Sequence, residues 1–298
     1  MADKNILHML SPLKHVSPFD LNMALDAGYD AVIPYAGVEQ KEVAGLVQDA
    51  IFSRSPKLGV RTGFFFGGKD AFLALDMLDA AKKAMVPPFA VSLFADPAGS
   101  FTTAAAMVTC VERVLRRKLQ RGLEGLAVAV FGATGVVGFS SAVIAARQGA
   151  KVTLVGYDGP ERVGKAAAEA SRRFEVALDI ADGSSREKVR SILANAEAVL
   201  SAGRAGTRIL DRDQLSAAAR LRVAADVNAV PPAGVEGLEL GANGEAIGDT
   251  KIFGIGALTI GQLKSKVESG LFRRMIQAEK PVVLDFRQAF DLARELAE

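Results

Sequence analysis

The chain has 298 residues, and its 50% hydrophobic and 23% charged residues are typical of a soluble α/β enzyme large enough for two domains. The 36 basic and 34 acidic side chains leave a formal net charge of +2, which gives no general case for nucleic acid or a membrane surface as a partner. The single cysteine, Cys110, excludes an intrachain disulfide framework and a cysteine-based zinc site, so we expect a small buried residue there and no metal centre.

Strand-like and helix-like segments alternate from the N-terminus onward, which predicts a parallel α/β architecture. In the first half, apolar runs predict strands at residues 5–10, 31–34, 61–66 and 89–94. Helices are expected at residues 18–27, 39–50 and 70–85, followed by a long helix that Ser100 or Thr102 caps and that ends near residue 121. The glycine-flanked segment 122–125 then suggests a domain boundary.

The second half repeats the alternation, with strands expected at residues 126–131, 151–155, 198–201, 223–226 and 251–255. Helices are expected between them, including 161–174 and 185–195, and two tail helices near 262–277 and 286–296 are expected to pack back on the first domain. We therefore predict a Rossmann-type NAD(P)-binding domain over residues 122–264. An α/β substrate domain with a parallel sheet is predicted over residues 1–121 plus 265–298.

The uncharged stretch 126–146 is long enough to span a bilayer, but its three glycines and its change from strand to helix pattern argue for a buried strand and crossover helix. The first residues lack the shape of a signal peptide. We therefore expect a cytoplasmic protein.

The junction after the strand at 126–131 is the most informative motif, because it predicts a strand, a tight turn and a helix start. Its glycines are spaced G-x-x-G-x-x-G, and such a turn presents backbone N–H groups and the positive end of a helix dipole to a pyrophosphate. The residues expected to bind a nicotinamide dinucleotide there are Gly132, Ala133, Thr134, Gly135, Val136, Val137 and Gly138.

The end of the next strand bears on the choice between NAD and NADP. Asp158 lies twenty residues past Gly138, where an acid can accept hydrogen bonds from the ribose hydroxyls, which favours NAD. Tyr157 and Asp158 are followed by Arg162 and Lys165, which could meet a 2′-phosphate or simply form a solvated helix face. The sequence leaves both nucleotides open.

The same glycine spacing occurs in short-chain dehydrogenases, which carry it at the N-terminus and use a Tyr-x-x-x-Lys pair. The chain is therefore not expected to be a short-chain dehydrogenase, because an isoleucine or a glutamate, and not a lysine, stands four residues after each of the tyrosines Tyr29, Tyr35 and Tyr157.

Other polar segments exceed what packing and capping require. A carboxylate, Asp20, stands near the start of the first helix, and residues 96–103 collect an acid and several hydroxyls before the long helix. Residues 226–234 follow a core strand, at the edge where ligands bind in parallel sheets.

These segments together resemble the NAD(P)-dependent methylenetetrahydromethanopterin dehydrogenases of bacterial one-carbon metabolism. The strings Asp-Pro-Ala-Gly-Ser-Phe-Thr-Thr and Asp-Val-Asn-Ala-Val-Pro-Pro are specific, whereas the glycine motif is not. The resemblance covers residues 6–20, 51–54, 66–68, 96–106, 132–138, 201–203, 226–234 and 254–264.

The resemblance implies that the first domain holds a tetrahydromethanopterin derivative as substrate and the second holds NADP or NAD. It suggests Lys264 as an active-site lysine and Asp20 near the pterin, and it suggests a homo-oligomer. Residues expected to bind the substrate are Phe19, Asp96, Gly99, Ser100, Thr102 and Thr103. Further residues expected to bind the dinucleotide are Tyr157, Asp158, Arg162, Ala202, Gly203, Asp226 and Asn228.

Family members that strictly prefer NADP are expected to carry a basic residue where Tyr157 stands, so dual use or NAD use is plausible here.

The implied reaction moves a hydride from a methylene group between two nitrogens, giving methenyltetrahydromethanopterin, and removes no proton. This suits a chain with only two histidines, both near its start. Three alternatives remain open: the same reaction on methylenetetrahydrofolate, a shikimate-dehydrogenase-like enzyme with Lys264 and Asp20 as acid and base, and a catalytically silent dinucleotide-binding protein.

Overall fold

The computed structural model describes residues 3–297, which form two compact units. Unit 1 comprises Met1–Thr102 and Ser265–Leu292, and unit 2 comprises Thr103–Lys264 and Ala293–Glu298. The chain passes from one unit to the other inside the helices α4 (Ser100–Leu119), α9 (Ala257–Gln277) and α10 (Phe286–Ala297). The first change of unit therefore falls within a helix rather than at the expected glycine-flanked segment 122–125.

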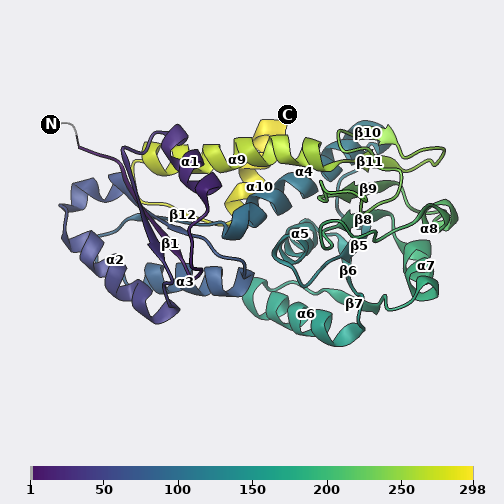
Figure 1. Cartoon of the computed structure of the whole chain (residues 1–298), viewed down its shortest axis with the longest axis horizontal. Helices are drawn as coiled ribbons and strands as arrows, with labels where there is room; N and C mark the ends of the chain where they lie inside the picture. Colours follow the sequence, from purple (N-terminus) through teal and green to yellow (C-terminus); the bar gives the residue numbers. More distant parts are fainter. Residues whose placement is uncertain (1–2, 298) are drawn as a thin grey trace. The chain divides into compact units, whose positions relative to one another are not determined.

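Unit 1 is built on a parallel five-stranded sheet, in the order β12-β4-β3-β1-β2. Its strands are β1 (Ile6–Ser11), β2 (Ala31–Ala36), β3 (Thr62–Phe66), β4 (Ser92–Ala95) and β12 (Val283–Leu284). The helix α1 (Pro18–Ala27) lies on one side of this sheet, and α2 (Val43–Phe52) and α3 (Ala71–Lys83) lie on the other (Figure 1). The core is aromatic: the rings of Phe65, Phe94 and Phe272 contact one another at centroid distances of 5.2–5.5 Å.

Unit 2 is built on a seven-stranded sheet, in the order β10-β11-β9-β8-β5-β6-β7, in which only the β10–β11 pair is antiparallel. Its strands are β5 (Ala127–Phe131), β6 (Lys151–Gly156), β7 (Asp179–Asp182), β8 (Ala198–Ser201), β9 (Val223–Asp226), β10 (Asn243–Ala246) and β11 (Phe253–Ile255).

The helices of unit 2 cover both faces of its sheet. Figure 1 shows α5 (Val136–Arg147) and α6 (Pro160–Phe174) on one side, and α7 (Arg186–Asn195) and α8 (Arg212–Ala217) on the other. The chain therefore leaves β5 and β8 in opposite directions, which makes the gap between their carboxyl ends the switch point where doubly wound sheets bind ligands. This confirms the predicted fold class.

Two expected elements differ in detail. The strand predicted at 89–94 begins only at Ser92, because Phe89 closes a turn by donating its N–H to the carbonyl of Val86 at 2.7 Å. The helix predicted over 39–50 starts instead as a 3₁₀ turn, Gln40–Glu42, before α2.

The sequence did not predict the strands β7, β10 and β12. The first two are short, polar edge strands, and β12 has only two residues, so none carries a strong apolar pattern. Within residues 3–297, no helix is long and apolar enough to cross a membrane.

Candidate dinucleotide and substrate sites

The predicted pyrophosphate turn lies at the switch point of the unit 2 sheet. Gly132 directly follows β5 and has a φ of +73°, a conformation that side chains disfavour. A Cβ atom at Gly132 would lie 2.1 Å from the carbonyl oxygen of Ala202, which follows β8. Only glycine therefore lets the loops after β5 and β8, including Ala202 and Gly203, approach this closely.

The other two glycines form the start of α5. A Cβ at Gly138 would lie 2.4 Å from the carbonyl oxygen of Gly132, so a side chain there would push the helix off the turn. Gly135 is the N-cap residue and places no side chain over the first turn of α5. Thr134 and Gly135 are exposed and Val136 and Val137 are half-buried, whereas Ala133 is buried. A bare helix start with glycines fitted to the strand is the cradle that a pyrophosphate requires, so these residues fit a dinucleotide.

Asp158 and Arg162, the acidic and the basic residue through which the sequence left NAD and NADP open, interact with each other beside this turn. The Arg162 guanidinium donates to Asp158 Oδ2 at 3.1 Å and to the Tyr157 hydroxyl at 3.2 Å, and it reaches Thr134 Oγ1 at 3.5 Å. The hydrogen bond and charge of Asp158 raise the pKa of Arg162, so the arginine stays cationic. Tyr157 is 73% exposed. A carboxylate and a guanidinium group thus stand together at the end of β6, and the contact of either with a dinucleotide stays a prediction.

Asp226 organises the loop after β9. Its Oδ2 accepts the backbone N–H groups of Gly234 at 2.8 Å and Val235 at 3.2 Å, and its Oδ1 accepts that of Asn228 at 3.2 Å. Burial raises the pKa of this carboxyl group against the opposing effect of these hydrogen bonds. A Cβ at Gly234 would lie 2.8 Å from Asp226 Oδ1, so glycine is needed where the loop closes over the carboxylate.

The side chain of Asn228 is also bonded to its own unit. Its Oδ1 accepts N–H groups from Gly206 at 3.1 Å and Val230 at 3.0 Å, and its Nδ2 donates to the carbonyl of Pro232 at 2.8 Å. The side chains of Asp226 and Asn228 therefore shape the loop through hydrogen bonds to its backbone. Direct contact between these two side chains and a dinucleotide stays a prediction.

In unit 1, the first helix presents an acid and an aromatic ring near its start. Ser17 is the N-cap of α1, and its Oγ accepts the N–H of Asp20 at 3.3 Å. The carboxylate of Asp20 is thus not the cap, and the residue is only 2% exposed, which is unusual for an acid. Phe19 is 49% exposed.

The hydroxyl-rich segment before α4 is held by Asp96. Its Oδ1 accepts the N–H of Phe101 at 2.7 Å and of Thr102 at 3.3 Å, and its Oδ2 accepts the Thr102 hydroxyl at 2.6 Å. The expected cap at Ser100 or Thr102 is therefore wrong. The capping carboxylate stands before the helix proper, because a short 3₁₀ turn, Pro97–Gly99, separates Asp96 from α4.

This segment also carries backbone strain. Ala98 has a φ of +53° and Gly99 a φ of +63°, and an alanine in the left-handed region costs about 1–2 kcal/mol. Ser100 and Thr103 are half-buried. Strained backbone of this kind gathers at functional sites, and no feature of the sequence indicated it.

The unit 1 residues that the sequence predicts to bind substrate lie near the carboxyl edge of its sheet. The N–H of Gly67 donates to the carbonyl of Leu10 at 2.9 Å, and the N–H of Asp96 donates to that of Phe66 at 3.2 Å. These bonds bring the ends of β1, β3 and β4 together, and α1 with Asp20 follows β1. Lys264 is half-buried within α9.

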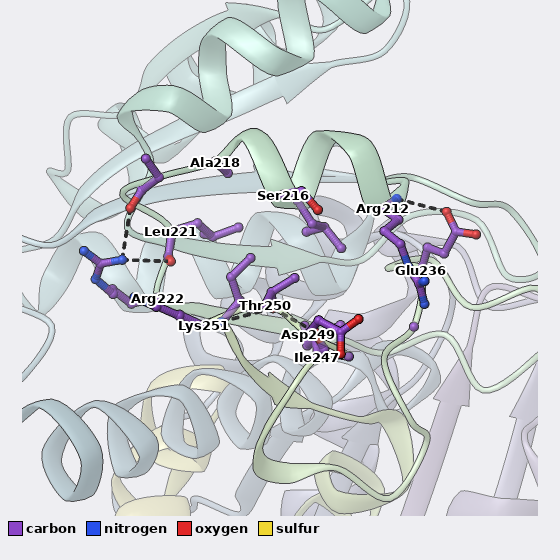
Figure 2. Close-up of a pocket in the computed structure, with 15 residues that line it drawn as sticks. Arg212, Ser216, Ala218, Leu221, Arg222, Glu236, Ile247, Asp249, Thr250 and Lys251 are labelled. Atoms are coloured by element: carbon purple, nitrogen blue, oxygen red, sulfur yellow. Dashed lines mark hydrogen bonds between the residues drawn. The ribbon is translucent and has the colours of Figure 1, made fainter.

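A hollow of about 330 Å³ in unit 2 lies apart from these residues (Figure 2). Its walls include α8, the segment before β9 and the turn before β11, so it adjoins the amino ends of those strands. Arg222 donates there to the carbonyls of Ala219 at 3.0 Å and Leu221 at 3.5 Å. Dinucleotide-binding residues belong at the opposite, carboxyl edge of the sheet.

Unit 2 has the doubly wound fold and the glycine-lined switch point of Rossmann-type dehydrogenases, and unit 1 is a second parallel α/β unit. Quinate dehydrogenase from Corynebacterium glutamicum, solved in complex with NAD, shares this fold, with a TM-score of 0.56 at 14% identity over the whole of both chains.

Sequence relatives narrow the class. A family model described as the N-terminal part of methylene-tetrahydromethanopterin dehydrogenase matches residues 18–98. The NAD(P)-dependent methylenetetrahydromethanopterin dehydrogenase of Methylorubrum extorquens is 51% identical over 294 residues, 99% of each chain. The bifunctional protein MdtA of the same organism is 32% identical over 284 residues, covering 94% of this chain and 95% of its own length. The chain belongs to the methylenetetrahydromethanopterin dehydrogenase family, which confirms the resemblance.

Proposed function

We propose that this protein oxidises methylenetetrahydromethanopterin to methenyltetrahydromethanopterin by transferring a hydride to NAD(P)⁺, as a step of formaldehyde oxidation in one-carbon metabolism. The observation that carries the proposal is the near full-length identity of 51% to an NAD(P)-dependent methylenetetrahydromethanopterin dehydrogenase. The glycine cradle between β5 and β8 supports it independently, because it fits the dinucleotide. By analogy with the family, we further propose a homo-oligomer that works in the cytoplasm.

Residues 132–138 are proposed to hold the pyrophosphate through backbone N–H groups at the start of α5. Asp158 would accept the ribose hydroxyls of NAD⁺, while Arg162 would meet the 2′-phosphate of NADP⁺. When bound, NAD(P)⁺ supplies the hydride acceptor, the C4 carbon of the nicotinamide. The presence of both an acid and a base supports use of either nucleotide.

On the pterin side, the two nitrogens that flank the methylene group stabilise the cation that forms, so the protein has no proton to remove. Its task is to align donor and acceptor carbons and exclude water. Phe19 offers an exposed ring for packing against a flat pterin, and the buried carboxylate of Asp20 would bind the ring edge or stabilise the developing cation.

Lys264 is proposed to position the pterin rather than to stabilise the charge, because an ammonium group beside a forming cation would repel it. This role predicts a loss of turnover when the lysine is replaced, without loss of dinucleotide binding.

The test is a two-by-two assay in which methylenetetrahydromethanopterin and methylenetetrahydrofolate are each supplied with NAD⁺ or NADP⁺, following the absorbance of the reduced nicotinamide. Lys264→Gln is expected to lower kcat at least tenfold. Lys266→Gln, an exposed lysine on the same helix, is the matched control and should keep the wild-type rate. Dinucleotide binding without turnover of either pterin would instead support a silent dinucleotide-binding protein. Turnover of only the folate would overturn the proposed substrate.

A further inference from the structure

A second hollow in unit 2 lies outside the proposed dinucleotide site. It has a volume of about 290 Å³, which is close to the lower end of small-molecule sites. It lies between the middle of α4 and the end of α10. The residues that line it are Thr109, Glu112, Arg113, Arg116, Arg117, Arg294 and Ala297.

The hollow has a strong excess of positive charge. Four arginines face one carboxylate, Glu112, which gives the lining a formal charge of +3. Both oxygens of Glu112 are occupied: Arg294 donates to them at 2.7 and 2.8 Å, and Arg116 donates to Oε1 at 2.8 Å. Although burial raises the pKa of Glu112, these two arginines hold it below its usual value, so the carboxylate stays ionised. The negative charge of Glu112 is therefore already paired with Arg116 and Arg294.

Two further guanidinium groups keep unused donors. Arg113 Nη2 donates to the side-chain oxygen of Asn243 and, at 3.9 Å, to Cys110 Sγ, whereas the guanidinium group of Arg117 makes no hydrogen bond or ion pair with any residue of the described range 3–297. A guanidinium group has five N–H donors in a planar fork that matches the oxygens of phosphate. Among the residues that the structure describes, the lining thus offers many donors for an oxyanion and one acid, Glu112, which is already paired.

A buried hydroxyl provides an independent observation. Thr109 lines the same hollow and is only 3% exposed, yet its Oγ1 has no hydrogen-bond partner in the part of the chain that the structure describes. A buried polar atom without a partner is costly, and such atoms in native proteins commonly mark a bound water, ion or ligand.

We propose that this hollow is a binding site for a small phosphate-bearing anion, a phosphate monoester or a diphosphate, separate from the dinucleotide. Arg113 and Arg117 would bind its oxygens, and Thr109 would donate its hydroxyl at the buried end. A monocarboxylate would use too few of the donors and too little of the charge. None of the lining residues lies in the loops after β5, β6, β8 or β9 that form the proposed dinucleotide site.

The experiment is isothermal titration of the full chain with pyrophosphate at low salt, in the presence of saturating NAD⁺ so that the proposed dinucleotide site is occupied, with KCl at matched ionic strength as the reference titration. Saturable one-to-one binding is expected. Arg117→Gln should weaken it about tenfold or more, because it removes charge-assisted hydrogen bonds, and Thr109→Val about fivefold, because it removes one neutral hydrogen bond. Arg147→Gln is the matched control. Arg147 is an exposed arginine at the end of α5, so the substitution removes the same charge and should change pyrophosphate binding less than twofold.

Thermal unfolding provides a second readout that separates a ligand role from a structural one. Without pyrophosphate, Thr109→Val should unfold at or above the wild-type temperature, because the hydroxyl lacks an internal partner. Pyrophosphate should raise the unfolding temperature of the wild type more than that of the variant.

Several results would overturn the inference. They are absence of saturable pyrophosphate binding, equal weakening by Arg147→Gln and Arg117→Gln, or clear destabilisation by Thr109→Val. Competitive inhibition of pterin oxidation by pyrophosphate that Arg117→Gln abolishes would also do so, since it would assign the hollow to the substrate's own anionic tail.

Discussion

Replacing Gly132 by alanine tests how far the packing of the dinucleotide turn depends on a missing side chain. Two costs follow from the structure. The φ of +73° places an alanine in the left-handed region, at about 1–2 kcal/mol. Its Cβ would also lie 2.1 Å from the carbonyl oxygen of Ala202, whereas real Cβ contacts essentially never fall below 3.0 Å.

The loops after β5 and β8 must therefore separate by about 0.9 Å, the difference between these two distances. Backbone on both sides of the contact cannot rotate away as a flexible side chain would, so we add an overpacking cost of about 1–3 kcal/mol. Gly132→Ala should thus lower the free energy of unfolding by about 2–5 kcal/mol, the sum of the two ranges. Because the displaced loop carries the proposed pyrophosphate site, NAD(P)⁺ affinity should fall at least tenfold.

Urea denaturation followed by circular dichroism measures the first quantity, and titration with each dinucleotide measures the second. Gly164→Ala is the matched control in the same unit. It lies inside α6, where the new Cβ would have an ordinary contact of 3.8 Å, so it should stabilise the protein by up to about 1 kcal/mol. A Gly132→Ala variant with wild-type stability and wild-type NAD(P)⁺ affinity would refute the reasoning. Lost stability with unchanged NAD(P)⁺ affinity would show that the dinucleotide binds at another place in the protein.

Three further changes test other parts of the molecule. Asp158→Ser removes the ribose acceptor and frees Arg162, so the ratio of kcat/KM for NADP⁺ to that for NAD⁺ should rise at least tenfold in steady-state assays; an unchanged ratio would contradict the assignment. Asp226→Asn replaces one carboxylate oxygen, which accepts backbone N–H groups, by an amide NH₂ group that cannot accept them. It should lower the free energy of unfolding in urea by about 2–3 kcal/mol, and no change would show that other contacts hold the loop. Glu112→Gln should cost about 1–2 kcal/mol at pH 7, less than a fully buried pair because its arginine partners are partly exposed. Since the hydrogen bonds of its arginine partners hold the folded-state pKa of Glu112 below the usual glutamate value, this contribution is present above that usual value and should disappear as the pH falls through the folded-state pKa; a pH-independent difference between wild type and variant would contradict it.

Local patterns predicted the elements with strong periodicity. The helix expected at residues 18–27 is α1 (Pro18–Ala27), and the strand expected at 198–201 is β8, because a helix start with a serine cap and a proline, and a short apolar run, each favour one local structure. The edge strands β7 and β10 escaped prediction because their residues are polar and pair only through backbone hydrogen bonds with distant segments.

For the site, the sequence indicated the residue types and the tertiary structure assigned their tasks. The glycine spacing predicted the turn, but only the pairing of β5 with β8 shows why Gly132 must be glycine. Asp96 stood among the predicted substrate residues, yet its carboxylate caps a helix that begins four residues later, beyond a 3₁₀ turn.

The sequence by itself determined the two-part α/β class, the place of the dinucleotide turn and the family. These depend on local periodicity and on short sequence motifs, which can be recognised without the tertiary structure. Only the tertiary structure decided which polar side chains are consumed inside the protein, as Asp226 and Asn228 are, and which keep unused donors, as Arg117 does. The physical reason is that hydrogen-bond satisfaction and burial depend on neighbours brought together from distant parts of the chain, which no local pattern records.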